Sequence, residues 1–145
     1  MNLRFNCKHQ QIAEGVWVKE SIIPVTLIGN SGVRLNITAI LDSGSDFILL
    51  PLEVAEALNL AFNIDTPDLA KTYTGASFST TKSMVKIEIK KGREEIKLQC
   101  KCAVILEKEK QHEHIIFGSS FFEQLKIVFD YPNNKFEIRS ATKRS

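Results

Sequence analysis

The sequence predicts a mainly β fold with two short helices, and three observations support this. Apolar and charged residues alternate over 85–90, and apolar residues recur at every second position over 96–104, which is the spacing of strands with one buried face. Two β-branched runs, 21–28 and 33–41, flank a turn cluster and predict a β-hairpin. Helical spacing of apolar residues is clear over 51–60, and a second short helix is expected after residue 118.

Composition sets the broad class. At 145 residues, the chain is expected to form one domain, 1–145, that buries about two-thirds of its unfolded surface. The hydrophobic fraction of 43% and the charged fraction of 25% are typical of a soluble globular protein. A net charge of +2 does not favour nucleic acid, and no apolar run is long enough to span a membrane. Three cysteines do not suggest a disulfide framework, and no signal peptide opens the sequence, so we expect a cytoplasmic protein.

The first half of the chain is predicted in order as follows. Residues 1–14 are expected to form an arm, and 16–18 a short strand. In the hairpin that follows, Pro24 cannot donate to a ladder, so its strand should lie at an edge or carry a bulge there. Proline at position 51 suits the first turn of the helix over 51–60.

The second half begins with a loop over 61–69 and ends with a tail over 140–145 that is expected to fray. Ser120 and Glu123 have the spacing of a capping box for the second helix. Between these ends we expect a polar hairpin end over 71–81, strands over 85–90 and 96–104, a solvated loop over 107–114, a buried strand over 115–117, and a hairpin of 126–130 with 135–139.

The strongest chemical signal lies in 39–51. An apolar β-type run ends at Asp42, and the tripeptide Ser-Gly-Ser follows before the chain becomes apolar again. Apolar flanks should leave Asp42 at least partly desolvated, with the Ser43 and Ser45 hydroxyls as donors within local reach. An Asp-(Ser/Thr)-Gly triplet occurs by chance in roughly one chain in twenty or thirty of this size, so the flanks carry the functional interpretation over that of an ordinary turn.

Other chemistries find less support. A serine hydrolase needs a histidine beside Ser43 or Ser45, and nothing in the sequence places one there. No glycine-rich loop opens a helix after a strand, as phosphate binding requires. The potential metal ligands come in pairs with one residue between, unlike the two to four common in structural zinc sites, so neither a metal nor a cofactor is expected. These ligands are Cys7, His9, Cys100, Cys102, His112 and His114.

Two segments resemble a known family. The run Ala-Ile-Leu-Asp-Ser-Gly-Ser at 39–45 resembles the active-site signature of the retropepsin-like aspartic proteases, the single-domain retroviral type. The run Ile-Ile-Phe-Gly at 115–118, with 119–125 after it, resembles the second conserved strand of that family and its short helix. The resemblance extends over about residues 20 to 139. It implies a closed acid-protease-type β-barrel that forms a two-fold homodimer.

The resemblance also implies a function, that of an aspartic endopeptidase acting on peptides or unfolded proteins. Hydrolysis of an amide by water needs one carboxylate to take a proton and another to give one. The chain has a single triplet, so Asp42 of a second copy would supply the partner, and the two would share one proton. The residues implied as catalytic are Asp42, Ser43 and Gly44, and those implied as substrate-binding are Gly44, Ser45 and Asp46 with Thr74, Gly75 and Ala76 of a flap that closes over the peptide.

The chain departs from the family pattern in two respects: its flap is poorer in glycine than the viral ones, and the residue after the second glycine differs. Members of the family often carry an arginine directly after the second glycine, where it can pair with an aspartate near the catalytic loop. Here that position is Ser119, so Asp46 lacks the expected partner unless Arg139 or a lysine replaces it. The alternative function is therefore a catalytically weak dimer of the same fold that acts as a peptide-binding or scaffold module.

Overall fold

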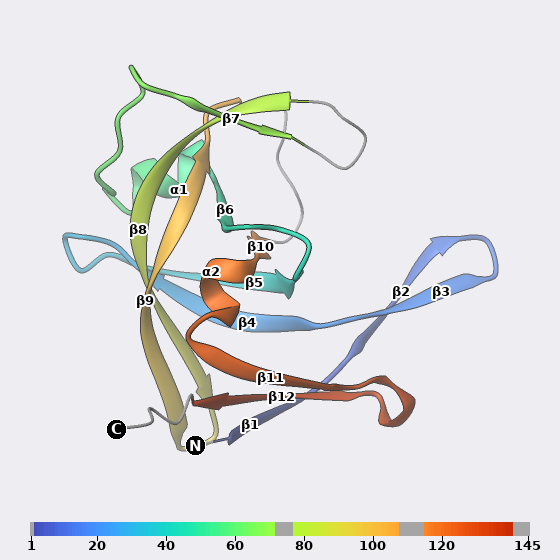
Figure 1. The fold of residues 1–145 in the computed structure, drawn as a ribbon. Coiled ribbons are helices and arrows are strands. Elements are labelled where there is room, and N and C mark those ends of the chain that lie inside the picture. The colour runs from blue at the N-terminus through green and yellow to red at the C-terminus, as the bar shows by residue number, and fades with distance from the viewer. Residues whose placement is uncertain (1, 72–76, 108–114, 141–145) are drawn as a thin grey trace.

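Most strands belong to one sheet that closes on itself. The computed structural model describes residues 2–71, 77–107 and 115–140 (Figure 1). Its largest sheet has the order β4-β5-β10-β6-β9-β8-β7, and β4 also pairs with β8, so six strands form a closed barrel with β7 at its margin. The predicted closed β-barrel is thereby confirmed. The barrel strands are β4 (Ile22–Ile28), β5 (Arg34–Leu41), β6 (Ile48–Pro51), β8 (Ser77–Lys91), β9 (Glu94–Ile105) and β10 (Ile115–Phe117), with β7 at Asp68–Lys71.

The β4–β5 hairpin confirms the two predicted strands around residues 29–32. Gly32 has a φ of +82° in the turn, a conformation that favours glycine. β8 pairs with β4 only from Thr26 to Ile28. Pro24 therefore lies where β4 has β5 as its ladder partner, which is the edge position expected for a proline.

The β8–β9 hairpin is the longest ladder of the barrel. Val85, Ile87 and Ile89 are buried, as their alternation predicts. Glu88 was expected on the charged face, but its side chain is only 3% exposed, and this prediction is wrong. Closure of β4 against β8 covers that face and brings Arg34 to 2.7 Å from the Glu88 carboxylate, which Lys90 also contacts at 3.0 Å.

Two short helices flank the barrel strands, as predicted. α1 (Leu52–Ala57) begins after Pro51 and stops before Asn59, whose φ of 52° is left-handed. α2 (Ser119–Phe122) follows β10. Its capping box is not formed, because the N-cap is Gly118 and the Ser120 hydroxyl is buried between strands, where it accepts the Ile48 N–H and donates to the Lys101 carbonyl.

A second sheet of order β1-β12-β11 packs beside the barrel. The prediction that residues 1–14 form an arm is wrong for residues 2–6. These residues form β1, which pairs along its whole length with β12 and buries Leu3 and Phe5 in the common core. Phe5 stacks on Phe136 with ring centroids 5.4 Å apart. The tail beyond Ser140 lies outside the described residues. The strands are β1 (Asn2–Asn6), β11 (Leu125–Asp130) and β12 (Lys135–Ser140), with a 3₁₀ turn at Tyr131–Asn133.

The remaining two strands form a separate hairpin. β2 (Lys8–Ala13) and β3 (Val16–Glu20) pair with each other in antiparallel register and project away from the barrel (Figure 1). The strand predicted over 16–18 is thus confirmed, with a partner that the sequence did not predict. Among the described residues, no helix is long and apolar enough to cross a membrane.

Candidate active site

The 42–46 loop joins β5 to β6, and β10 fixes both of its ends. β10 runs parallel to β5, with Phe117 opposite Leu41, and antiparallel to β6, with Ile116 opposite Leu49. The Asp42 N–H donates to the Phe117 carbonyl at 2.9 Å. The loop therefore leaves the barrel from a strand pair that a distant segment holds in place.

Within the loop, the backbone orients the carboxylate of Asp42. Its Oδ1 accepts the Gly44 N–H at 2.9 Å, and its carbonyl accepts the Ser45 N–H at 3.2 Å. The Ser45 hydroxyl donates instead to the Phe47 carbonyl at 2.9 Å. The donor to the carboxylate is thus a backbone N–H, and the expectation of a Ser45 hydroxyl in that role is wrong for the single chain.

Asp42 is exposed in the single chain, contrary to the expected desolvation. Its apolar neighbours Leu41 and Ile48 point into the core, but the loop itself stands at the rim of the barrel. Ser43 and Gly44 are exposed beside it. A carboxylate that the backbone holds firmly and leaves open to solvent is positioned to meet a further molecule.

The second motif supports the loop through its backbone. The Ser119 N–H donates to the Ser45 carbonyl at 2.7 Å, and the Ser120 N–H donates to the Asp46 carbonyl at 3.2 Å. These bonds attach the loop to the start of α2 at the position where the resemblance suggests an arginine. Arg139 does not replace that arginine, since its guanidinium donates to Glu137 on the other sheet.

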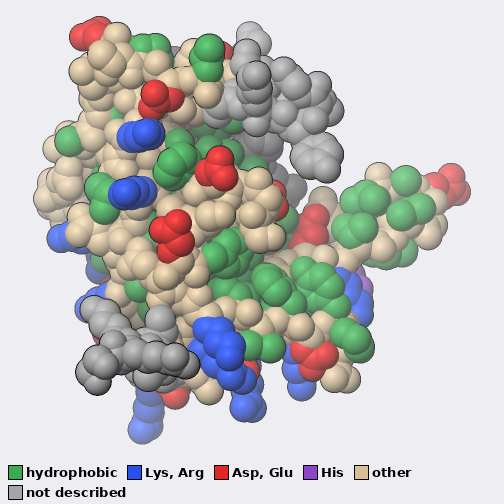
Figure 2. All heavy atoms as spheres, in the orientation of Figure 1, with side chains coloured by type: hydrophobic (Ala, Val, Ile, Leu, Met, Phe, Trp, Pro, Cys, Tyr) green, Lys and Arg blue, Asp and Glu red, His purple; other side chains and the backbone are tan. Residues whose placement is uncertain are grey.

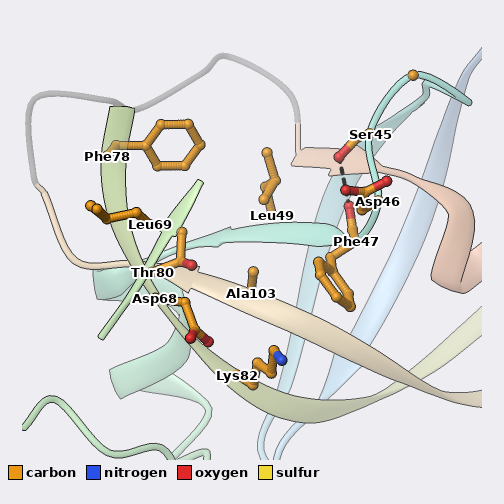
Figure 3. Close-up of a pocket in the computed structure, with 11 residues that line it drawn as sticks. Ser45, Asp46, Phe47, Leu49, Asp68, Leu69, Phe78, Thr80, Lys82 and Ala103 are labelled. Atoms are coloured by element: carbon orange, nitrogen blue, oxygen red, sulfur yellow. Dashed lines mark hydrogen bonds between the residues drawn. The ribbon is translucent and has the colours of Figure 1, made fainter. Parts of the chain in front are cut away.

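A cleft of about 450 Å³ opens next to the loop (Figure 3). Gly44, Ser45 and Asp46, which the resemblance implies as substrate-binding residues, line it, whereas Asp42 and Ser43 do not. Strands β7 and β8, the base of the predicted flap hairpin, form the opposite wall, and Thr74, Gly75 and Ala76 of its tip lie outside the described residues. The other lining residues are Phe47, Leu49, Asp68, Leu69, Phe78, Thr80, Lys82 and Ala103.

Sequence reasoning missed most of this opposite wall. Phe78, Thr80 and Lys82 are spaced by two, so they lie on one face of β8 and reach the same cleft (Figure 3). That spacing was the available signal, but the surrounding hydroxyl-rich residues obscured it. The cleft therefore combines apolar walls with ionisable groups from the loop and from β7 and β8.

The cysteines lie apart from this site. Cys100 and Cys102 are buried on the inner face of β9, as their spacing predicts. Burial raises the pKa of the Cys100 thiol to about 11 and that of Cys102 to about 12. Thiols held in this protonated form behave as small apolar core residues. His112 and His114 lie outside the described residues.

This chain is similar to known proteins both in sequence and in structure. A family model described as eukaryotic aspartyl protease matches residues 11–141. A retropepsin-like aspartic protease from Rickettsia conorii is similar in structure, with a TM-score of 0.46 and 20% sequence identity over 83% of this chain and 98% of that one. No curated protein matches the sequence.

Proposed function

Because the chain belongs to the aspartyl protease family, we propose that it is a homodimeric aspartic endopeptidase in which two copies of Asp42 activate water. One observation carries the proposal: the backbone holds the Asp42 carboxylate at an exposed rim beside a cleft. The cleft is lined by the loop, by the barrel strands β6, β8 and β9, and by the marginal strand β7.

A single Asp42 supplies one carboxylate, whereas the reaction requires two. A two-fold axis beside the loop would bring a second Asp42 against the first, and its exposure leaves room for that contact. Two carboxylates this close share one proton, because like charges cannot both ionise there. With Oδ1 engaged by Gly44, the proposal assigns Oδ2 to the shared proton and the water.

The proposed reaction proceeds in two steps. The ionised Asp42 takes a proton from water as the water oxygen attacks the carbonyl carbon of the scissile peptide, while the protonated Asp42 gives its proton to the carbonyl oxygen. The resulting gem-diol then breaks its C–N bond: the protonated Asp42 gives a proton to the leaving nitrogen, and the ionised Asp42 takes a proton from a gem-diol hydroxyl, so that an amine and a carboxylic acid form and the starting dyad is restored. The peptide lies between the loop and the β7–β8 wall, with the Gly44 backbone beside it.

Asp42→Asn tests the proposal, since it removes the ionisable group at nearly constant shape. Wild type should cleave a denatured protein at acidic pH and be inhibited by pepstatin, and the variant should lose this activity while keeping its fold and dimer. Asp65→Asn, an exposed acid in the 61–67 segment, is the matched control and should cleave like wild type. A wild-type dimer that binds pepstatin without cleaving any peptide of a diverse library would instead establish the scaffold alternative.

A further inference from the structure

The β2–β3 hairpin carries large apolar side chains into solvent. In the part of the chain that the structure describes, its strands pair only with each other. Ile12 is 61% exposed and Trp17 is 60% exposed. Val16 and Trp17 are successive in one strand, so they point to opposite faces of the hairpin. An isolated two-stranded hairpin is marginally stable in water, and apolar groups gathered on one indicate a surface that another molecule covers.

The base of this hairpin lies beside the candidate catalytic loop. Ser21, the residue between β3 and β4, is buried, and its carbonyl accepts the N–H of Leu41 at 2.9 Å. Leu41 directly precedes Asp42. On the other side, Lys19 donates to the Tyr131 carbonyl, and the Ser21 hydroxyl lies 3.3 Å from the Tyr131 hydroxyl. The hairpin therefore leaves the body between the 42–46 loop and the end of β11.

Exposed aromatic residues continue the apolar surface at that end. Phe129 and Tyr131 are 43% and 42% exposed and form an edge-to-face pair with centroids 5.7 Å apart. The β2–β3 hairpin and the turn between β11 and β12 both extend toward the side at which β5 ends (Figure 1). Figure 2 shows hydrophobic side chains over the hairpin and over the neighbouring part of the molecule. This surface, the interface patch, consists of Ile12, Val16, Trp17, Phe129 and Tyr131.

We propose that the interface patch packs on a second copy of the chain, so that each β2–β3 hairpin clamps its partner. The proposal rests on the proposed function, in which two Asp42 carboxylates meet at a distance of about 3 Å. The five residues of β3 extend about 17 Å at roughly 3.3 Å each. A hairpin that starts beside Asp42 and extends that far from its own barrel, on the side at which β5 ends (Figure 1), would run along the body of a partner placed against the 42–46 loop.

Symmetry makes this contact reciprocal. In a two-fold dimer the same patch on each copy takes part, so two hairpins would each cover a surface of the other copy. The hairpin thereby adds contact area outside the catalytic loops themselves.

The chain contains a single tryptophan, so the fluorescence of wild type reports on Trp17 alone. Over one dilution series, sedimentation velocity gives the dimer fraction, while emission and acrylamide quenching give the environment of Trp17. We expect the emission to move to shorter wavelength and the quenching to fall in parallel with dimer formation. If the dimer forms and cleaves peptide but Trp17 stays fully quenchable, the clamp is overturned and the proposed function stands. If no dimer forms at any concentration, the proposed function falls, and the clamp falls with it.

A pair of variants gives a second readout. Trp17→Ser should raise the dimer dissociation constant at least about tenfold, as a central interface tryptophan does, and should leave the monomer fold intact because the side chain is exposed. Val33→Ser removes an exposed apolar side chain beside the β4–β5 turn and should leave that constant unchanged. Equal dissociation constants for Trp17→Ser and wild type would overturn the clamp.

Discussion

The carbonyl oxygen of Ser45 occupies the space that any side chain at Gly118 would need. A Cβ built on Gly118 would come 2.2 Å from that oxygen, and the Phe47 carbonyl would lie 2.7 Å away. Because the two backbone segments lie this close, the N–H of the neighbouring Ser119 donates to the same Ser45 carbonyl oxygen. The segment at Gly118 and Ser119 therefore supports the 42–46 loop through backbone contacts that leave no room for a side chain at Gly118, and the position of the loop depends on them.

Gly118→Ala should displace the loop. The φ of Gly118 is −103°, which alanine accepts, so the effect is steric, and overpacking of this kind costs about 1–3 kcal/mol of unfolding free energy. We expect a lower urea midpoint and a large fall in kcat, because Asp42 moves with the loop. Ser119→Ala, which keeps the backbone contact, is the matched control. Wild-type kinetics in Gly118→Ala would show that the loop does not rely on this contact.

Ser45→Ala should leave the pH profile of peptide cleavage in place. The Ser45 hydroxyl donates to the Phe47 carbonyl and not to the Asp42 carboxylate, so its removal should not move the pH optimum of cleavage. A neutral hydrogen bond of this kind contributes about 0.5–1.5 kcal/mol to stability. The measurement is kcat/KM against pH for both proteins. An upward shift of the pH optimum in the variant would indicate that the Ser45 hydroxyl donates to the proposed Asp42 dyad in the dimer.

Glu88→Gln should lower stability at neutral pH and matter less in acid. Hydrogen bonds from Lys90 and then Arg34 hold the pKa of Glu88 below its ordinary value of 4.5. Between the lowered pKa of Glu88 in the folded chain and its ordinary pKa in the unfolded chain, the unfolded chain binds more protons. The contribution of Glu88 to the free energy of unfolding is therefore complete above about pH 4.5 and is lost as the pH falls through the folded pKa.

Urea midpoints of wild type and Glu88→Gln should therefore differ at neutral pH and converge as the pH falls through the lowered folded pKa of Glu88. Glu95→Gln is the matched control, because its side chain is 44% exposed and its contacts with lysines should contribute little. A gap for Glu88→Gln that stays constant with pH would mean that its effect is one of packing and not of charge.

Mixing wild type with an excess of Asp42→Asn should suppress cleavage as subunits exchange. Each heterodimer would hold one ionisable carboxylate, so activity should follow the fraction of wild-type homodimer. Specific activity should also fall on dilution below the dimer dissociation constant. The same mass of an unrelated protein serves as the control for the mixing experiment. Activity per milligram that is unaffected by either treatment would point to a second acid within one chain.

The alternation of apolar and polar residues predicted most of the barrel strands, because a strand with one buried face has an apolar residue at every second position. It succeeded for Val85, Ile87 and Ile89, and for the cysteines of β9. It failed for Glu88, whose burial arises from the closure of β4 on β8, a contact between segments far apart in the chain. It also failed for β1, where Leu3 and Phe5 are too few to signal a strand without their partner β12.

The candidate site was predictable in its residue types but not in its hydrogen bonds. The triplet at 42–44 and its flanks indicated a carboxylate at the end of a buried strand. Which donor would meet that carboxylate depended on the curl of the loop, and a backbone N–H from Gly44 took the place foreseen for a hydroxyl. The exposure of Asp42 follows from its place at the barrel rim, which no local pattern encodes.

The pairing of β10 with β5 also sets an order of events during synthesis. Residue 42 leaves the ribosome long before Phe117, which accepts its N–H, and before Ser119 and Ser120, which hold the rest of the loop. At roughly 5–20 residues per second, that interval lasts about 4–15 s. Throughout it the nascent chain has the aspartate but not the frame that orients it. A growing chain therefore cannot complete the candidate site until the segment that holds the loop has been synthesised, and this delay comes from topology alone.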